Sequence, residues 1–298
     1  MLGFGEKTAT GIHLSGQRAW LLSMSRQRSG VEPLALVEFD LPVCANASDL
    51  AKPDVQVQLV DALREVGDEY DVDFSNTCFA LDSNVVFVKR STLISGSERE
   101  MREHMRWEAE QFLVGEQASF SMDYVLESEW GLFVAVRRSA LTGYLALGKQ
   151  IGMRRVDVEV PAFALYNAAE GTGVFSRIAG SEVLVYVAVS EAYMLLIDQG
   201  EAMQVAHCHW GEDENAMDVI FGLVDRLASE VRGRVECIRC AGGGVEKWGV
   251  KLADHLQCEM AFIDPLAEIG EEMASDWDPA RRSGYAVAAG LVQRGLAS

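Results

Sequence analysis

The sequence lacks any long hydrophobic run and any recognisable targeting segment. No apolar stretch approaches the roughly 20 residues that a transmembrane helix needs. The first residues show no basic region followed by an apolar run, the pattern of a signal peptide. We therefore expect no signal peptide and no direct membrane insertion, so that any membrane role must pass through a partner.

Positive charge and cysteine are both scarce. The chain has 26 Lys and Arg against 45 Asp and Glu, which gives a formal net charge of −19 at pH 7. Such a surface repels a nucleic-acid duplex or an anionic lipid surface, so we expect no nucleic-acid partner. The six cysteines are scattered and do not resemble a disulfide framework. We expect them to be reduced thiols of a cytoplasmic protein.

The motifs of several enzyme classes are absent as well. The chain has no Gly-x-Ser-x-Gly hydrolase elbow, no Walker pattern and no dinucleotide-binding fingerprint. Cys237 and Cys240 form a Cys-x-x-Cys, but residues three apart on a strand point to opposite faces, so we interpret them as structural thiols. His207 and His209 share one face of a predicted strand, where a metal could bind. Because no second ligand pair lies nearby in the sequence, we interpret them as a polar strand end.

What the sequence does contain is an order of strands and helices that occurs twice, an α/β pattern. In the first half, hydrophobic periodicity predicts elements near residues 8–14, 19–25, 34–41, 54–67, 77–81, 85–88, 97–112, 119–126, 132–136, 139–151, 155–160 and from Pro161 onward. In the second half it predicts elements near residues 183–189, 193–197, 203–208, 216–227, 235–239, 246–256, 260–263 and 284–296. Asp54 is the predicted N-cap of the first helix and Gly67 its end.

The length and composition suffice for two lobes, each with its own core, since 49% of the 298 residues are hydrophobic. Residues 171–180 contain three glycines and no periodic apolar pattern, so we place a hinge or boundary there. We predict an N-terminal lobe over residues 1–172 and a C-terminal lobe over residues 180–298.

The most regular helix signal begins at Ser97. Ser97 followed by Glu100 is a capping box, in which each side chain bonds the backbone amide of the other residue. The residues behind it have the spacing of an amphipathic surface helix. We interpret Trp107 and Phe112 on this helix as buried core, with partner contact as the alternative.

The segment Arg106-Trp107-Glu108-Ala109-Glu110-Gln111-Phe112, the alternating strand pair after it, and Val158-Glu159-Val160-Pro161-Ala162-Phe163-Ala164-Leu165 resemble the PilM family. Those proteins are actin-like and lie on the cytoplasmic side of type IV pilus assembly machines. The resemblance is specific from Ser97 to Glu170 and looser elsewhere. It implies an actin-like, duplicated ribonuclease H-like fold of two lobes, with a small subdomain inserted at about residues 85–155.

The resemblance also implies where a nucleotide would bind. Family members carry an Asp, a turn Gly and a Lys in their first strand and turn, where this chain has His13, Ser15 and Trp20. In the second phosphate turn, Tyr186 and Ala188 replace an Asp and a Gly. A neutral imidazole does not replace a carboxylate for Mg²⁺, which prefers oxygen ligands. A side chain in place of glycine also obstructs the close approach of backbone to phosphate.

The loop Gly242-Gly243-Gly244 corresponds to the adenosine-side loop and is intact, although a strand-to-helix turn accounts for such glycines without a ligand. We therefore predict a degenerate nucleotide cleft with no catalytic residue, no metal and no cofactor, and ATP binding is the alternative. The residues of this predicted cleft are Gly242, Gly243, Gly244, His13, Ser15, Tyr186 and Ala188.

The family resemblance implies a non-enzymatic adaptor for the short cytoplasmic tail of an inner-membrane protein, PilN. The assembly motor ATPase is a second implied partner, and the expected location is the cytoplasmic side of the inner membrane. One alternative is the cytoplasmic domain of the type II secretion L protein, which resembles the same fold. Another is an active actin-like ATPase or sugar kinase, which would need the carboxylates that His13 and Tyr186 replace.

Overall fold

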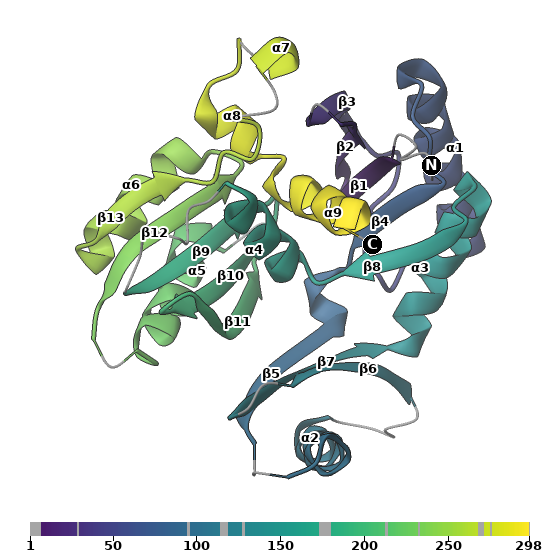
Figure 1. Cartoon of the computed structure of the whole chain (residues 1–298). Coiled ribbons are helices and arrows are strands. Elements are labelled where there is room, and N and C mark those ends of the chain that lie inside the picture. Colours follow the sequence, from purple (N-terminus) through teal and green to yellow (C-terminus); the bar gives the residue numbers. More distant parts are fainter. Residues whose placement is uncertain are drawn as a thin grey trace.

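The computed structural model describes residues 7–28, 30–93, 96–113, 119–126, 129–172, 180–211, 214–231, 233–267, 271–274 and 276–297. They form two lobes, each built on a five-stranded sheet, and a small subdomain that projects from the first lobe (Figure 1). The predicted boundary at residues 171–180 falls largely on 173–179, outside the described residues. Within the described residues, no helix is long and apolar enough to cross a bilayer.

The first sheet has the strand order β3-β2-β1-β4-β8, in which the first three strands are antiparallel and β4 and β8 run parallel to β1. The strands are β1 (Lys7–Ser15), β2 (Arg18–Arg26), β3 (Val31–Asp40), β4 (Asn76–Ala80) and β8 (Arg155–Glu159). Two helices of this lobe pack on each other, α1 (Pro53–Tyr70) and α3 (Arg138–Ile151).

The second sheet repeats this topology with the order β11-β10-β9-β12-β13. Its strands are β9 (Ser181–Val187), β10 (Glu191–Asp198), β11 (Glu201–His209), β12 (Val235–Gly242) and β13 (Glu259–Phe262). The helices beside it are α5 (Ala216–Ala228) and α6 (Val245–Leu256), with the short α7 (Glu271–Ala274) and α8 (Pro279–Ser283) after them. Two sheets of equal order, each a meander followed by two parallel strands, are the result expected for a duplicated unit.

Two helices lie between the lobes, α4 (Pro161–Gly171) and α9 (Ala286–Ala297) (Figure 1). α9 packs on β1, β2 and β4 of the first sheet, α4 packs on β9 and β10 of the second, and the two helices pack on each other. One core cluster therefore runs from the first lobe across α4 and α9 to side chains of the second sheet such as Tyr186 and Leu195. The lobes are joined by buried apolar contact as well as by the chain.

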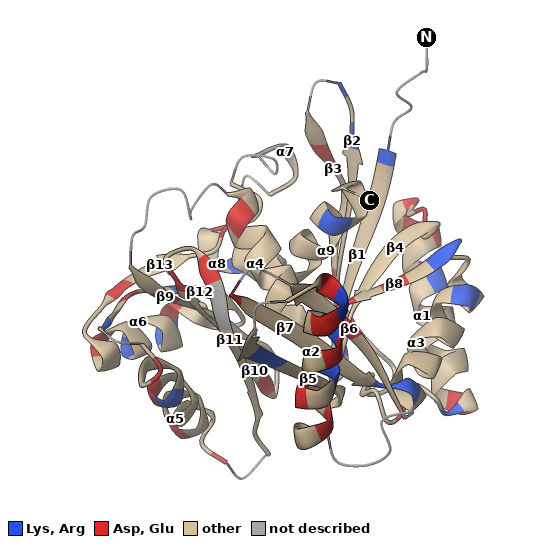
Figure 2. Cartoon of the chain, turned by 60° about the horizontal axis from the view of Figure 1, so that its bottom comes forward, with Lys and Arg blue, Asp and Glu red and all other residues tan. Residues whose placement is uncertain are grey.

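The small subdomain is a three-stranded antiparallel sheet with one helix beside it. It consists of β5 (Val86–Thr92), β7 (Trp130–Arg137) and β6 (Phe120–Leu126), with α2 (Glu98–Phe112) packed on the sheet, and a 3₁₀ turn, η1 (Ser83–Val85), leads into it. Leu93, Met105, Ala109 and Phe133 form its separate core. Acidic and basic residues alternate along α2 (Figure 2), among them the ion pair between Glu98 and Arg102.

Some local predictions were wrong. α1 begins at Pro53 with Lys52 as its N-cap, so Asp54 lies inside the first turn and is not the cap; proline is favoured at the first helical position because its fixed φ suits a helix and its missing N–H is not needed there. Gly67 lies inside α1, which ends at Tyr70, and a Cβ there would come within 2.5 Å of the Phe74 ring. Close packing, not termination, requires this glycine.

Trp107 and Phe112 are also not core residues. Their exposed fractions are 54% and 46%. Phe112 lies at the end of α2, where its ring stacks on Phe87 and the Lys89 ammonium lies 3.0 Å from its centroid. The helical period alone predicted a buried side for Phe112. This residue is the last of α2, however, and the period does not show whether other elements cover that end of the helix.

The capping box at the start of α2 is confirmed, because Ser97 Oγ accepts from the Glu100 amide and the Glu100 carboxylate accepts from the Ser97 amide. We expect Ser97→Ala to lower the free energy of unfolding by about 1 kcal/mol, since an N-cap hydroxyl is lost. Urea denaturation followed by circular dichroism measures this. Glu103→Gln on the exposed face of α2 is the matched control. It removes only the exposed ion pair with Arg99 and should cost less than about 0.5 kcal/mol, so equal effects of both changes would contradict the role of the cap.

Candidate functional site

Four rings gather where the hairpin β1–β2 of the first lobe meets the hairpin β9–β10 of the second. His13 pairs with Trp20 across the first hairpin, and Tyr186 pairs with Tyr193 across the second. His13 stacks on Trp20 with ring centroids 5.3 Å apart, and Tyr186 stacks on Tyr193 at 5.8 Å. The His13 ring meets both tyrosines edge to face, at 5.3 and 5.9 Å. We call His13, Trp20, Tyr186 and Tyr193 the aromatic cluster.

The aromatic cluster is closed to solvent, and no ring in it is more than 6% exposed. Burial lowers the pKa of His13 to about 3, so the imidazole is neutral at physiological pH. Its Nε2 lies 3.2 Å from the Tyr193 hydroxyl, whereas Nδ1 is buried with no hydrogen-bond partner among the described residues. The Tyr186 hydroxyl donates to the Gly284 carbonyl at 2.9 Å. The positions that the resemblance assigns to metal-binding carboxylates thus hold uncharged, packed rings.

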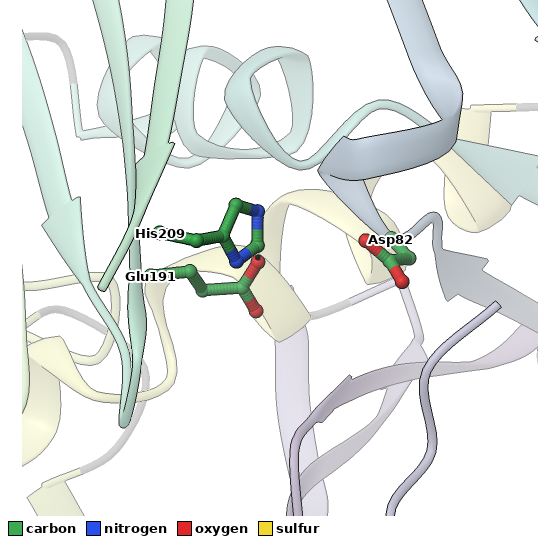
Figure 3. A group of neighbouring side chains, drawn as sticks. All are labelled: Asp82, Glu191 and His209. Carbon is green, nitrogen blue, oxygen red and sulfur yellow. Dashed lines mark ion pairs between the residues drawn. The ribbon is translucent and has the colours of Figure 1, made fainter. Parts of the chain in front are cut away.

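Beside the aromatic cluster lies a group of polar side chains from both lobes. The Ser15 hydroxyl, at the end of β1, donates to the Glu191 carboxylate at 2.7 Å, a bond from one lobe to the other. Ser83 Oγ in η1 donates to the other oxygen of Glu191 at 3.1 Å and lies 3.2 Å from His209 Nε2. Asp82, Glu191 and His209, drawn in Figure 3, each offer a ligand atom, and all these atoms lie within 4.8 Å of one another. We call these three residues the polar cluster.

The order of the chain explains why this group assembles. Asp82 follows β4, Glu191 begins β10 and His209 ends β11, so all three lie at strand ends that face the gap between the lobes. The Asp82 carboxylate accepts from the amides of Ala47 and Asn84, each at 2.9 Å, which holds it in place. The sequence signal was only the pair His207 and His209; Asp82 and Glu191 were missed because the residues that complete the site are distant in the sequence.

The glycine loop borders a separate cleft of about 340 Å³ between the lobes. Its lining includes Arg18 and Trp20 from the first lobe, Ala188 and the three glycines from the second, and Arg281 near the end of α8. Gly242 has φ +101° and Gly244 φ +64°, conformations that favour glycine. A Cβ at Gly242 would also overlap with the Val187 carbonyl. Gly243 has neither constraint, since nothing lies within 4 Å of the position that a Cβ would take there.

All seven residues predicted for the cleft therefore lie around the gap between the lobes. His13 and Tyr186 belong to the aromatic cluster, Ser15 bonds the polar cluster, and Ala188 with the three glycines lines the open cleft. Whether they bind a nucleotide stays a prediction.

Cys237 and Cys240 lie apart from this site, on β12. Cys240 is buried in the core of the second lobe, whereas Cys237, three residues earlier on β12, lines a surface hollow with Arg239 and Glu259. Burial raises the pKa of the Cys237 thiol to about 11 and raises the pKa of the Cys240 thiol well above its ordinary value. Both are protonated at neutral pH, so neither has the thiolate character of a redox or metal-binding cysteine.

No protein-family model matches the chain, and neither does any curated protein sequence. Solved structures do match. A chain of the PilM–PilN type IV pilus biogenesis complex superposes with a TM-score of 0.73 at 17% identity, over 97% of this chain and 98% of that one. A Bacteroides thetaiotaomicron protein with an actin-like ATPase fold superposes with a TM-score of 0.52 at 12% identity, over 90% and 95% of the two chains. This chain has an actin-like fold.

A third actin-like match is the ethanolamine utilization protein EutJ from Carboxydothermus hydrogenoformans, with a TM-score of 0.51 at 10% identity over 98% of this chain and 90% of EutJ. The fold class predicted from the sequence, α/β and actin-like with two lobes, is confirmed by these likenesses and by the repeated sheet order. Both clusters and the 340 Å³ cleft lie in the gap between the two lobes.

Proposed function

We propose that this protein is a cytoplasmic adaptor of a type IV pilus-like assembly platform, which binds the short cytoplasmic tail of a PilN-like inner-membrane protein and does not hydrolyse ATP. The observation that carries the proposal is the likeness, over nearly the whole of both chains, to a chain of the PilM–PilN complex. The resemblance of the sequence from Ser97 to Glu170 to the PilM family supports the same assignment. The protein would be held at the membrane through this tail, and the assembly motor ATPase would be a further partner.

The aromatic cluster supports the loss of ATP hydrolysis. Phosphoryl transfer depends on cations that neutralise charge on the phosphates. His13 is neutral and Tyr186 is buried, so neither holds Mg²⁺ as a carboxylate would. A rigid pair of lobes that recognises a peptide needs shape and apolar pockets instead.

Calorimetric titration with Mg-ATP tests the nucleotide part of the proposal. We expect no saturable heat at millimolar nucleotide, because the rings of His13 and Tyr186 stand at the positions where the family resemblance would place metal-binding carboxylates. The competing outcome is binding in the 340 Å³ cleft, whose glycine loop is open. One-to-one binding in the micromolar range would show that the lobes still accept a nucleotide and would overturn this part.

Titration with synthetic tails tests the partner. The peptides would be the cytoplasmic tails of single-pass membrane proteins encoded beside this chain, each with a scrambled peptide of equal composition as its control. We expect one tail to bind one-to-one, whereas its scrambled control gives no saturable heat, because recognition of an extended peptide depends on the order of its side chains. If every native tail behaves like its scrambled control, the adaptor assignment is wrong.

A further inference from the structure

The polar cluster holds two carboxyl groups without a lysine or arginine partner among the described residues. The Glu191 side chain is 7% exposed, and the described groups around it are the hydroxyls of Ser15, Ser83 and Tyr193 and the imidazole of His209, 3.6 Å away. Asp82 lies in the same group, and within the described ranges no Lys or Arg forms an ion pair with either carboxylate. Buried carboxylates in proteins are ordinarily paired with a cation or coordinate a metal. A cation therefore belongs here.

The donors are arranged as a ligand set. Figure 3 shows the His209 ring and the Glu191 carboxylate side by side on the second lobe, with Asp82 facing them from the first. An ion with ligands at about 2.0–2.2 Å spans donors that are roughly 4 Å apart. Since the three ligand atoms already lie within 4.8 Å of one another, small side-chain rotations would complete the coordination. The His209 side chain is 31% exposed, which leaves a path for entry.

Hydrogen bonds from surrounding groups also orient the two carboxylates of the proposed ligand set. Ser15 and Ser83 donate to the two oxygens of Glu191, and the amides of Ala47 and Asn84 donate to Asp82. Such outer hydrogen bonds orient metal-binding carboxylates. One imidazole with two carboxylates suits Zn²⁺, Mn²⁺ or Fe²⁺, whereas Mg²⁺ and Ca²⁺ favour oxygen alone.

We propose that Asp82, Glu191 and His209 bind one divalent transition-metal ion. The site is distinct from His13 and Tyr186, where the resemblance would place the metal ligands of a nucleotide. Because Asp82 belongs to the first lobe and the other two ligands to the second, the ion ties the lobes together and fixes the width of the gap between them. The site does not depend on the adaptor function, and its test uses no partner or nucleotide.

Titration of the metal-free full chain with Mn²⁺, followed by electron paramagnetic resonance, and with Zn²⁺, followed by calorimetry, tests the site. We expect one ion per chain. Asp82→Asn, Glu191→Gln and His209→Gln should each weaken binding at least about tenfold, since even outer-shell changes cost that much. The matched control is His255→Gln, which removes an exposed imidazole that bonds Asp225 at 2.7 Å, and it should bind as tightly as the wild type.

Two further measurements keep the outcome decisive. Glu191→Gln keeps the side-chain volume and removes the unneutralised charge, so the metal-free variant should melt no lower than the wild type, whereas added Zn²⁺ should raise the melting temperature of the wild type alone. Co²⁺ should give a spectrum without a thiolate charge-transfer band. No binding of Mn²⁺ or Zn²⁺, binding that survives both Glu191→Gln and His209→Gln, or a thiolate band would each overturn the proposal.

Discussion

Replacing Gly290 by alanine should lower the free energy of unfolding by about 3 kcal/mol, the upper end of the usual range for overpacking, since the added methyl group meets rigid backbone. Gly290 lies in α9 where this helix crosses α4, and a Cβ there would overlap with the Ala164 carbonyl. The helices would have to separate, and α9 also rests on β1, where a Cβ at Gly11 would likewise overlap with the Ala288 carbonyl. The loss would therefore extend to the contact between the lobes.

Urea denaturation followed by circular dichroism measures this effect. The control is Gly222→Ala in α5, an exposed helical glycine with nothing within 4 Å of a Cβ. That change should stabilise the protein by about 0.5–1 kcal/mol, because alanine loses less conformational entropy than glycine when a helix forms. A Gly290→Ala variant within about 1 kcal/mol of the wild type, on the scale of ordinary substitutions, would contradict the close crossing of α4 and α9.

The stability of the wild type should depend on pH through His13. Burial lowers the pKa of His13 from 6.5 to about 3 in the folded protein. As the pH falls below 6.5, the unfolded chain binds a proton at this residue before the folded chain does, so the free energy of unfolding decreases. One such group contributes a slope of about 1.4 kcal/mol per pH unit until the pH approaches the folded pKa.

The variant His13→Gln cannot take up this proton, so its stability should fall less steeply between pH 6.5 and about pH 5. The informative quantity is the difference between the two unfolding free energies measured by urea titration at each pH. Other groups with shifted pKa values, such as Glu159, whose pKa is raised by burial, titrate in both proteins and cancel in that difference. Above about pH 7 the two curves should run parallel; parallel curves down to about pH 5 would mean that His13 is not held neutral.

The aromatic cluster around His13 also joins the two lobes. A neutral, stacked imidazole packs with Trp20, Tyr186 and Tyr193 as an apolar unit, which joins the lobes where a nucleotide-binding protein would keep charge and water. The hydrogen bond from Ser15 to Glu191 of the neighbouring polar cluster is a second contact between the lobes. Together they favour a gap of fixed width over lobes that open and close.

Much of the fold could be predicted from the sequence because it depends on local pattern. Alternating apolar residues identified β1, β2 and β3, the 3.6-residue period identified α5 and α6, and Ser97 with Glu100 marked the start of α2. The repeated order of elements, with the resemblance in the middle of the chain, was sufficient for an actin-like fold. Even there, Gly67 was misread, since only the packed structure reveals the Phe74 ring beside it.

The sequence by itself determined the elements and their duplicated order, because both follow from residues close together in the chain. Only the tertiary structure decided that His13 and Tyr186 stack in one buried cluster, that Phe112 stays exposed, and that Asp82 meets Glu191 and His209 across the lobes. The reason is physical: hydrogen bonding and hydrophobic period act locally along the chain, whereas contacts between strand ends arise only when two separately formed sheets dock.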